Sequence, residues 1–508
     1  MNSIKLKRMN YVHSWLGVLF GLFIFVVVFS GILALFPEEL VAWENQSLRL
    51  SEETEEVGAD AVLKSITNNA IELGKIQTIT LFLPTDHKPY FESFTQILSS
   101  DKSRNTMHNI WSSSTGEILD PIGKGASYWL LNFHRDFVIP NHNIGRPLVG
   151  VSGMLLMFML VTGIIIHRKI IADLFKCHLV TKSIKMRFRS THNALGIWGL
   201  PFYFMIAFTG VAVGVLPKLV PVVGVVAFKG DQAALMDLLV ERVEPTGVKA
   251  PMYSLDKAKE KIEITTQKIV DRVLIFNWQD ELASYRLLFE TPYELQQMGL
   301  ADVNAVSGEI VSISSQVEHG LAIKVNQAIS ALHYGTYAGL WLKFLYVLLG
   351  IATSLLITTG LYLWLERRLN GPTGGLSPLS YKLINGVVVG TTSGLVVASI
   401  GLLYVDRLMA FSAAERLAGN GYSFFIIWVG IILVGLLYPN KKQFNKMLLS
   451  ASAILLMGMS VLDWLLTGQT ILDLWLGQQT VLAGVNLFSF IAGVILAFVL
   501  YKKTNNIE

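Results

Sequence analysis

Four histidines occupy equivalent positions in two halves of the chain. His13 and His192 each open a long apolar segment, in which Leu-Gly follows at the third and fourth positions and a hydroxyl residue with Gly at the seventeenth and eighteenth. His134 and His333 each precede another apolar segment, which carries a Thr-Gly pair. Imidazole is the commonest protein ligand for metal ions and a normal axial ligand of haem iron. The repeat therefore predicts two metal or haem sites with two histidines each.

The segments that carry these histidines predict a polytopic α-helical membrane protein. The 508 residues are 52% hydrophobic and only 15% charged. Apolar segments of about 18 or more residues are candidates for membrane spans. Hydropathy indicates eight such segments, at about 13–36, 146–167, 192–216, 338–365, 383–405, 422–438, 446–465 and 480–501.

Basic residues predict how these spans are oriented. Five clusters of Lys and Arg lie on one side of an even-numbered topology, and the positive-inside rule places that side and both chain termini in the cytoplasm. We therefore expect the chain in the lipid bilayer of a bacterial inner (cytoplasmic) membrane. The net charge of +4 is small and lies in short clusters, which indicates no nucleic-acid partner. The single cysteine, Cys177, excludes an internal disulfide and a cysteine-based metal cluster.

Two long polar segments separate the spans and are expected on the outer, periplasmic side. Each combines a predicted amphipathic helix, at 61–72 or 254–264, with strand-like segments, and each ends in a turn at Gly116 or Gly308, where glycine supplies a positive φ. The sequence thus predicts transmembrane helix 1 (1–37), α+β module 1 (38–128), transmembrane helices 2 and 3 with a basic loop (129–216), module 2 (217–330), transmembrane helix 4 (331–370) and C-terminal transmembrane helices 5–8 (371–508).

The predicted topology groups the histidines into two pairs. His13 and His192 begin helices that run from inside to outside, so both lie near the cytoplasmic face. His134 and His333 begin helices that run the other way, so both lie near the periplasmic face. Facing helices of a bundle commonly hold cofactors between them. A four-helix bundle from the duplicated halves would therefore hold one histidine pair above the other.

Glycines beside the first pair favour haem over a bare ion. Gly17 and Gly196 lie four residues after their histidines, on the same helix face one turn along, where a side chain would occupy the space that a porphyrin needs. A bare ion would want three or four ligands, with carboxylates or cysteines among them. We therefore expect two b-type haems. The spacing of Gly17 and Gly21 also fits simple helix packing, which remains an alternative.

Arginines near each predicted pair can bind haem propionates through charge-assisted hydrogen bonds. Arg135 and Arg146 lie near the outer pair. Arg8, Arg187 and Arg189 lie near the inner pair.

The histidine motifs together resemble the PepSY-associated transmembrane (PepSY-TM) family. The resemblance covers about residues 8–370. It depends on His-x-x-Leu-Gly at 13–17 and 192–196, on Phe-His-Arg-Asp at 133–136, on Leu-His-Tyr-Gly at 332–335 and on the hydroxyl-Gly pairs. The Ser/Thr-Gly-Glu turns resemble those that close PepSY modules. The resemblance implies His13, His134, His192 and His333 as haem ligands and the two outer segments as PepSY-like modules.

The best understood members of this family are inner-membrane siderophore reductases. The resemblance implies that electrons from membrane quinol or a cytoplasmic reductase pass through two haems to a ferric siderophore at the outer modules, whose iron is released as Fe(II). Some relatives carry a fused flavin and nicotinamide domain, but this chain has no Rossmann-type glycine fingerprint.

Two other functions fit parts of the sequence. The chain could be a non-redox membrane protein whose PepSY modules bind or inhibit a peptidase. It could also be an iron-chelate permease, although the predicted spans show no helix pair broken by Gly or Pro at mid-membrane, a feature typical of transporters.

Overall fold

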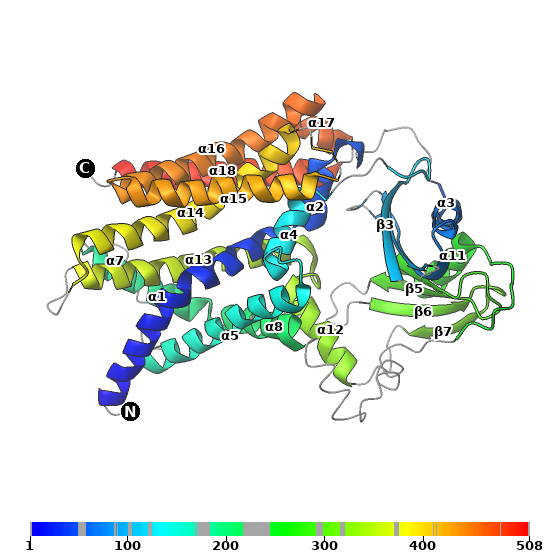
Figure 1. Ribbon diagram of the computed structural model, residues 1–508, viewed down its shortest axis with the longest axis horizontal. Helices are drawn as coiled ribbons and strands as arrows, with labels where there is room; N and C mark the ends of the chain where they lie inside the picture. Colours follow the sequence, from blue (N-terminus) through cyan, green and yellow to red (C-terminus); the bar gives the residue numbers. More distant parts are fainter. Residues whose placement is uncertain are drawn as a thin grey trace.

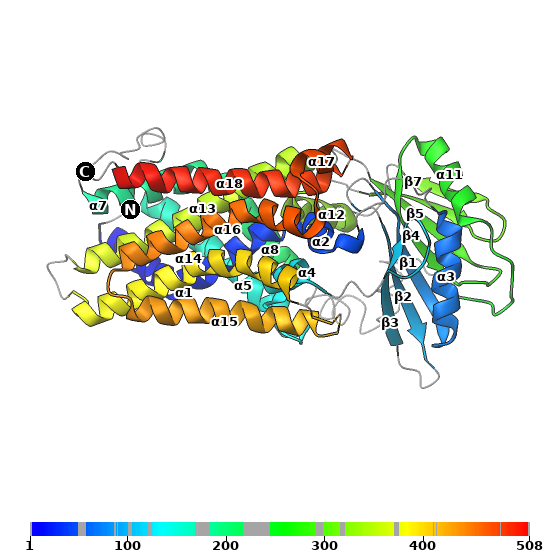
Figure 2. The same cartoon turned by 90° about the horizontal axis from the view of Figure 1, so that it is seen from above.

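The chain forms a group of long apolar helices and, beside one end of it, a β-sheet unit (Figures 1 and 2). The computed structural model describes residues 3–48, 57–85, 88, 90–99, 104–119, 124–167, 170, 183–216, 244–290, 298–314, 321–369, 375–409, 411–412, 414–477 and 479–505. Most of the basic loop expected between spans two and three lies outside this part, as does Cys177. Both chain ends lie at the end of the helices away from the sheet, which we call the distal end, and the opposite end is the sheet end.

Long apolar helices confirm the prediction of a polytopic helical membrane protein. Seven helices of the described chain are long and apolar enough to cross a membrane, and a bent pair brings the number to eight if it counts as one span. The seven are α1 (Ser3–Leu33), α5 (His142–Ile166), α13 (Gly339–Leu369), α14 (Pro378–Leu408), α15 (Arg416–Leu437), α16 (Lys441–Thr467) and α18 (Thr480–Asn505).

The third predicted span, 192–216, is not one straight helix. It consists of α7 (Ile184–Trp198) and α8 (Leu200–Val215), which meet at an angle of 68°. Pro201 has no backbone N–H to continue the helix, and its ring excludes the helical position of the carbonyl four residues before it. Gly199 leaves room for Tyr203, whose ring a β-carbon at position 199 would meet at 2.0 Å. The prediction that no span is broken by Gly or Pro was therefore wrong.

Short helices lie at the sheet end of the long helices (Figure 1). They are α2 (Pro37–Glu44), a 3₁₀ turn at Gln46–Leu48, α4 (Ala126–Asp136), α12 (Leu321–Tyr334) and α17 (Ile471–Leu476). His134 lies on α4 and His333 on α12. These two histidines thus belong to separate short helices and not to the first turns of α5 and α13.

The two predicted α+β modules share one antiparallel sheet. Its strand order is β3-β2-β1-β4-β5-β6-β7, and β1 and β4 join the two modules. Helices α3 (Ala59–Ile71) and α11 (Leu255–Thr266) cover the face turned away from the membrane helices (Figure 2). Gly116 and Gly308 have positive φ angles of 68° and 74°, as predicted. The strands are β1 (Lys75–Phe82), β2 (Tyr90–Leu98), β3 (Arg104–Ser112), β4 (Val270–Phe276), β5 (Ser284–Glu290), β6 (Met298–Asn304) and β7 (Ile310–Ser314).

The equivalent helices of the two modules cap each other. The carboxylate of Asp256 on α11 accepts hydrogen bonds from the backbone N–H groups of Ala59 and Asp60 at 2.7 and 3.0 Å. The carboxylate of Asp60 on α3 accepts from the N–H of Leu255 at 2.7 Å and the hydroxyl of Ser254 at 2.5 Å. Each aspartate satisfies the free N–H groups at the start of the other helix. The exchange ties the modules together beyond the β1–β4 pairing.

The four C-terminal spans pack as a unit, formed by α14, α15, α16 and α18. Its central helix, α14, is the most deeply buried of the apolar spans. Gly386 and Gly390 bring α14 against α15, because β-carbons at these positions would lie 2.4 Å from the carbonyl oxygen of Gly435 and 2.7 Å from the Cα of Ile432. Small residues that allow such close approach are typical of helix packing in membranes.

Candidate functional site

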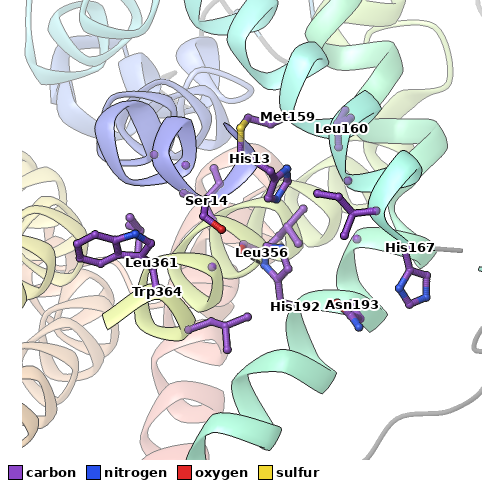
Figure 3. Close-up of a pocket in the computed structure, with 18 of the residues that line it drawn as sticks. His13, Ser14, Met159, Leu160, His167, His192, Asn193, Leu356, Leu361 and Trp364 are labelled. Carbon is purple, nitrogen blue, oxygen red and sulfur yellow. Dashed lines mark hydrogen bonds between the residues drawn. The ribbon is translucent and has the colours of Figure 1, made fainter. Parts of the chain in front are cut away.

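The structure brings the four histidines together in two pairs, each with one member from either half. His13 on α1 and His192 on α7 form the distal pair, with ring centroids 6.4 Å apart and ring planes at 74°. His134 on α4 and His333 on α12 form the sheet-end pair, with the same separation of 6.4 Å and an interplanar angle of 18°. Figure 3 shows the side chains of the distal pair reaching into one cavity.

Hydrogen bonds at Nδ1 orient the four imidazoles. The Nδ1 atom of His192 lies 2.9 Å from the carbonyl oxygen of Leu356, and that of His134 lies 3.0 Å from the carbonyl oxygen of Val27. A carbonyl only accepts, so both Nδ1 atoms carry the proton. The proton-free Nε2 is then the ring atom able to bind a metal, and a second-shell acceptor on the other nitrogen is typical of metal-ligating histidines.

The other two histidines are held by threonine hydroxyls. Nδ1 of His13 lies 2.8 Å from Oγ1 of Thr162, and Nδ1 of His333 lies 3.1 Å from Oγ1 of Thr209. Each hydroxyl also lies within hydrogen-bond distance of carbonyls one turn earlier in its own helix. The hydroxyl proton is therefore used within the helix, and the oxygen accepts from the imidazole N–H. All four histidines thus present the same tautomer.

Each histidine ring also lies against the glycine of a hydroxyl-Gly pair. A β-carbon at Gly31 would lie 2.9 Å from Cε1 of His134, and one at Gly360 would lie 3.0 Å from Cε1 of His192. The corresponding distances are 3.3 Å from Gly210 to His333 and 3.6 Å from Gly163 to His13. We call each hydroxyl-Gly pair a histidine seat; the four seats are Ser30-Gly31, Thr162-Gly163, Thr209-Gly210 and Thr359-Gly360.

Each histidine contacts a seat from its own half of the chain, whereas each histidine pair joins one residue from either half. His13 and His134 are seated by α5 and α1, which belong to the first half with them; His192 and His333 are seated by α13 and α8 of the second half. The sequence showed the hydroxyl-Gly pairs as part of the repeat, but it did not show that they contact the histidines. Their recurrence in each apolar segment was the signal that could have revealed this contact.

A cavity of about 280 Å³ surrounds the distal pair. Gly17, Gly21 and Gly196 line it, and β-carbons at Gly17 and Gly196 would meet Cε of Met159 at 3.2 Å and Cδ1 of Leu356 at 3.5 Å. Both glycines thus lie at the cavity, and their role in leaving space for a porphyrin stays a prediction. Gly21 also faces Leu361 of α13 at 3.2 Å, as the helix-packing alternative expects.

Two arginines line the same cavity. They are Arg189, which the sequence analysis named as a candidate, and Arg367 at the end of α13, which it did not. Arg8 and Arg187 are exposed and do not line it. Arg189 and Arg367 supply the positive charge that carboxylates of a ligand would need.

Residues around the sheet-end pair form a polar network next to His134. Arg135 donates to the carboxylate of Asp136 at 3.2 Å and to the side chain of Asn132. Asp136 is fully buried and also binds Nδ1 of His142 at 2.7 Å. Arg135 is thus close to the pair, as predicted, but its charge is shared with Asp136.

Burial makes the sheet-end imidazoles poor bases. Loss of solvent lowers the pKa of both histidines; for His333, burial and the neighbouring His134 together lower the pKa to about 3. The surroundings thus favour the neutral imidazole, which is the form that binds metal.

The distance between the rings of each pair is compatible with one metal ion bound by both imidazoles. A metal–nitrogen bond is about 2 Å long, and the nitrogen lies about 1.1 Å from the centre of an imidazole ring with bonds near 1.33 Å. Two imidazoles on opposite sides of one metal ion therefore have centroids about 6 Å apart. Both pairs have 6.4 Å. Within the described chain, no group of three or more His, Cys, Asp or Glu side chains is placed to hold a metal ion. A bare ion at either pair would have two protein ligands, whereas a porphyrin supplies four nitrogens of its own.

The fold and the paired histidines define a class of helical membrane protein with two stacked sites of two imidazoles each, joined to a sheet of two related modules. The chain belongs to the PepSY-associated TM region family, whose model matches residues 11–367. It is also similar to the "Uncharacterized protein PA4219" of Pseudomonas aeruginosa, with 26% identity over 351 residues, which are 65% of this chain and 85% of that protein. The C-terminal unit lies beyond the family match.

Proposed function

We propose that this protein is a di-haem reductase of the bacterial inner membrane, which passes electrons across the membrane to a ferric siderophore in the periplasm and releases Fe(II). The observation that carries the proposal is the geometry of the two imidazole pairs. The ring centroids of both pairs are 6.4 Å apart, a separation compatible with one iron between two ring nitrogens, and in all four rings Nδ1 donates to an acceptor from the same half.

The residues of each pair would hold one b-type haem. His13 and His192 would be the ligands at the distal site, where Gly17 and Gly196 leave room and Arg189 and Arg367 would bind the propionates. His134 and His333 would be the ligands at the sheet-end site. When bound, the two haems supply one-electron carriers at two depths of the membrane. Apolar residues that line the distal cavity would limit the access of water to the haem there.

The charge distribution supports the direction of electron flow. Arg367 and Arg368 end α13 at the distal cavity, and both chain termini lie at the same end (Figure 1). The positive-inside rule favours this end for the cytoplasm and the sheet for the periplasm. Membrane quinol or a cytoplasmic reductase would supply the electrons. The family resemblance supplies the ferric siderophore as substrate, and reduction helps because Fe(III) is a harder ion than Fe(II) and is held more tightly by oxygen donors.

Absorption spectroscopy tests the cofactor part of the proposal. Protein purified in detergent from haem-replete cells should show b-type bands that sharpen on reduction with dithionite. His13→Ala and His333→Ala should each lose one haem, whereas His108→Ala, which changes a histidine of the sheet, should retain both. A colourless wild-type protein would overturn the proposal.

Anaerobic mixing tests the activity. Dithionite-reduced protein, freed of excess reductant, should be reoxidised by a ferric siderophore while a chromogenic chelator traps Fe(II). Unchanged spectra after addition of several ferric siderophores would contradict the reductase.

The broken third span supports an iron-chelate permease as an alternative function. The bend between α7 and α8 removes the sequence argument against an iron-chelate permease, because discontinuous helices often form transport sites. Proteoliposomes distinguish the two functions. A permease would accumulate radiolabelled ferric chelate without any reductant, whereas a reductase would release Fe(II) only when electrons are supplied.

A further inference from the structure

Helix α4, which carries His134, packs against the C-terminal unit as well as its own half. The ring centroids of Trp129 on α4 and Phe424 on α15 are 4.4 Å apart. The ring centroid of Phe133, next to His134, lies 5.1 Å from that of Phe424. Phe133 also contacts Phe425 and Trp428 of α15. Trp129 and Phe424 are almost completely buried. The aromatic face of α4 is therefore fixed by α15.

A second contact holds the start of α4. The fully buried carboxylate of Glu44 on α2 accepts hydrogen bonds from the backbone N–H and the hydroxyl of Ser127, at 2.9 and 2.7 Å. It thereby caps a helix whose own N-cap residue, Gly125, has no side chain to do so. Burial and the nearby Asp406 together raise the pKa of Glu44 to about 8.

The neighbours of Glu44 bind α2 to three helices of the C-terminal unit. Trp43 donates from Nε1 to the side chain of Asn486 on α18 at 3.0 Å, and its carbonyl accepts from Arg407 on α14. Asn45 accepts from Arg416 on α15 at 2.6 Å. Arg416 is in turn paired with Asp406, its Nε lying 2.8 Å from the carboxylate. A buried polar network therefore runs from the C-terminal unit through α2 to the start of α4.

We infer that the C-terminal unit positions α4, and with it His134, so that Phe424, Gly421 and Glu44 are positioning residues for the sheet-end haem ligand. This inference rests on the proposed di-haem function. None of these residues reaches the histidine pair itself; they act through Trp129, Phe133 and Ser127. Near the distal pair, the C-terminal unit makes a different contact: Trp15 and Val18 of α1 pack with Val388 of α14, and α15 takes no part in this cluster of described residues.

Two glycines of α15 provide a matched test. A β-carbon at Gly421 would lie 2.9 Å from Nε1 of Trp129, closer than real β-carbons come to other atoms. The indole is held between Phe133 and Phe424 and cannot simply rotate away. A β-carbon at Gly430, on the same helix, would meet nothing within 4 Å. Gly421→Ala should therefore displace α4, whereas Gly430→Ala should not, although both have the same effect on helix propensity.

The readout is the state of each haem. The interplanar angles of 18° and 74° differ enough that the two ferric sites should give separate electron paramagnetic resonance signals. We expect Gly421→Ala to weaken haem retention at the sheet-end pair roughly tenfold, the lower end of what loss of ligand support costs, and to leave the distal signal unchanged. Gly430→Ala should match wild type. Trp129→Phe in the Gly421→Ala background removes the crowded N–H group and should restore the signal.

The possible failures are distinguishable. If wild-type protein contains no haem, the proposed function fails. If wild type contains two haems and Gly421→Ala keeps both unchanged, or loses both equally, the positioning inference fails. Hydrogen exchange of the full-length protein gives a haem-independent check, in which the amides of 126–136 should exchange faster in Gly421→Ala than in Gly430→Ala; equal rates would also refute the inference.

Discussion

Substitution of Gly31 by alanine tests whether the histidine seats have the role proposed for them. Gly31 lies on α1 against the ring of His134, and an alanine β-carbon would lie 2.9 Å from Cε1, where ordinary contact begins at 3.4 Å. The ring must therefore withdraw by about 0.5 Å to restore a normal carbon–carbon contact. It has little freedom to do so, because its Nδ1 is bound to the carbonyl of Val27, one turn earlier on the same helix.

This displacement is large for a metal ligand. Coordination distances are typically kept within about 0.2 Å of their ideal values, so a shift of about 0.5 Å should weaken haem binding at the sheet-end pair tenfold or more, as disturbed second-shell support does. The substitution should nevertheless favour α1 itself, because Ala exceeds Gly in helix propensity by about 0.5–1 kcal/mol. Loss of haem without loss of helix stability is therefore the expected combination.

Gly163→Ala is the matched control at the distal pair. Its β-carbon would lie 3.6 Å from Cε1 of His13, an ordinary contact. Haem content per chain, measured as the pyridine complex after gel filtration, should fall from two to about one in Gly31→Ala and stay at two in Gly163→Ala. Equal haem content in the two variants would refute the idea that the glycine of a seat is needed for ring clearance.

Two further predictions concern the sheet. Asp60→Ala removes one of the reciprocal helix caps and should lower the free energy of unfolding by about 1–2 kcal/mol, measured by thermal denaturation. Glu260 is exposed, so Glu260→Ala is a control that should change little. An equal effect of the two substitutions would contradict the capping role. Glu92 is buried, which raises its pKa, but the hydrogen bond from His108 and the charge of Lys88 outweigh burial and hold the pKa near 2. Its ionised form therefore stabilises the fold above pH of about 4.5, and this contribution, on the order of 2–3 kcal/mol, should be lost as the pH falls through about 2. The difference in stability between wild type and Glu92→Gln should shrink over that range; a constant difference would show that the pair contributes nothing.

The membrane architecture could be predicted from the sequence because long apolar segments leave few other folds. The repeat and the alternating direction of the spans were enough to group His13 with His192 and His134 with His333, and the structure has these residues 6.4 Å apart. Their role as haem ligands remains a prediction. The separation of α4 and α12 from the following spans was not visible, because short helices that end near the membrane surface carry no clear hydropathy signal.

Other features depend on contacts that sequence periodicity does not report. Pro201 alone suggested no break, since proline is tolerated in membrane helices when neighbours satisfy the freed carbonyls. The single sheet arises from pairing between β1 and β4, which are far apart in the sequence. Arg367 lines the distal cavity only because α13 packs against α1 and α7. In each case, the deciding partner comes from another part of the chain.

Contacts with the C-terminal unit distinguish the two helices that carry the sheet-end pair. Helix α4 packs mainly against α5, α1 and α2 of its own half and also against α14 and α15, whereas the main partner of α12 is α8 of its own half. If the two pairs bind haem as proposed, this difference in ligand support would contribute to different reduction potentials of the two haems.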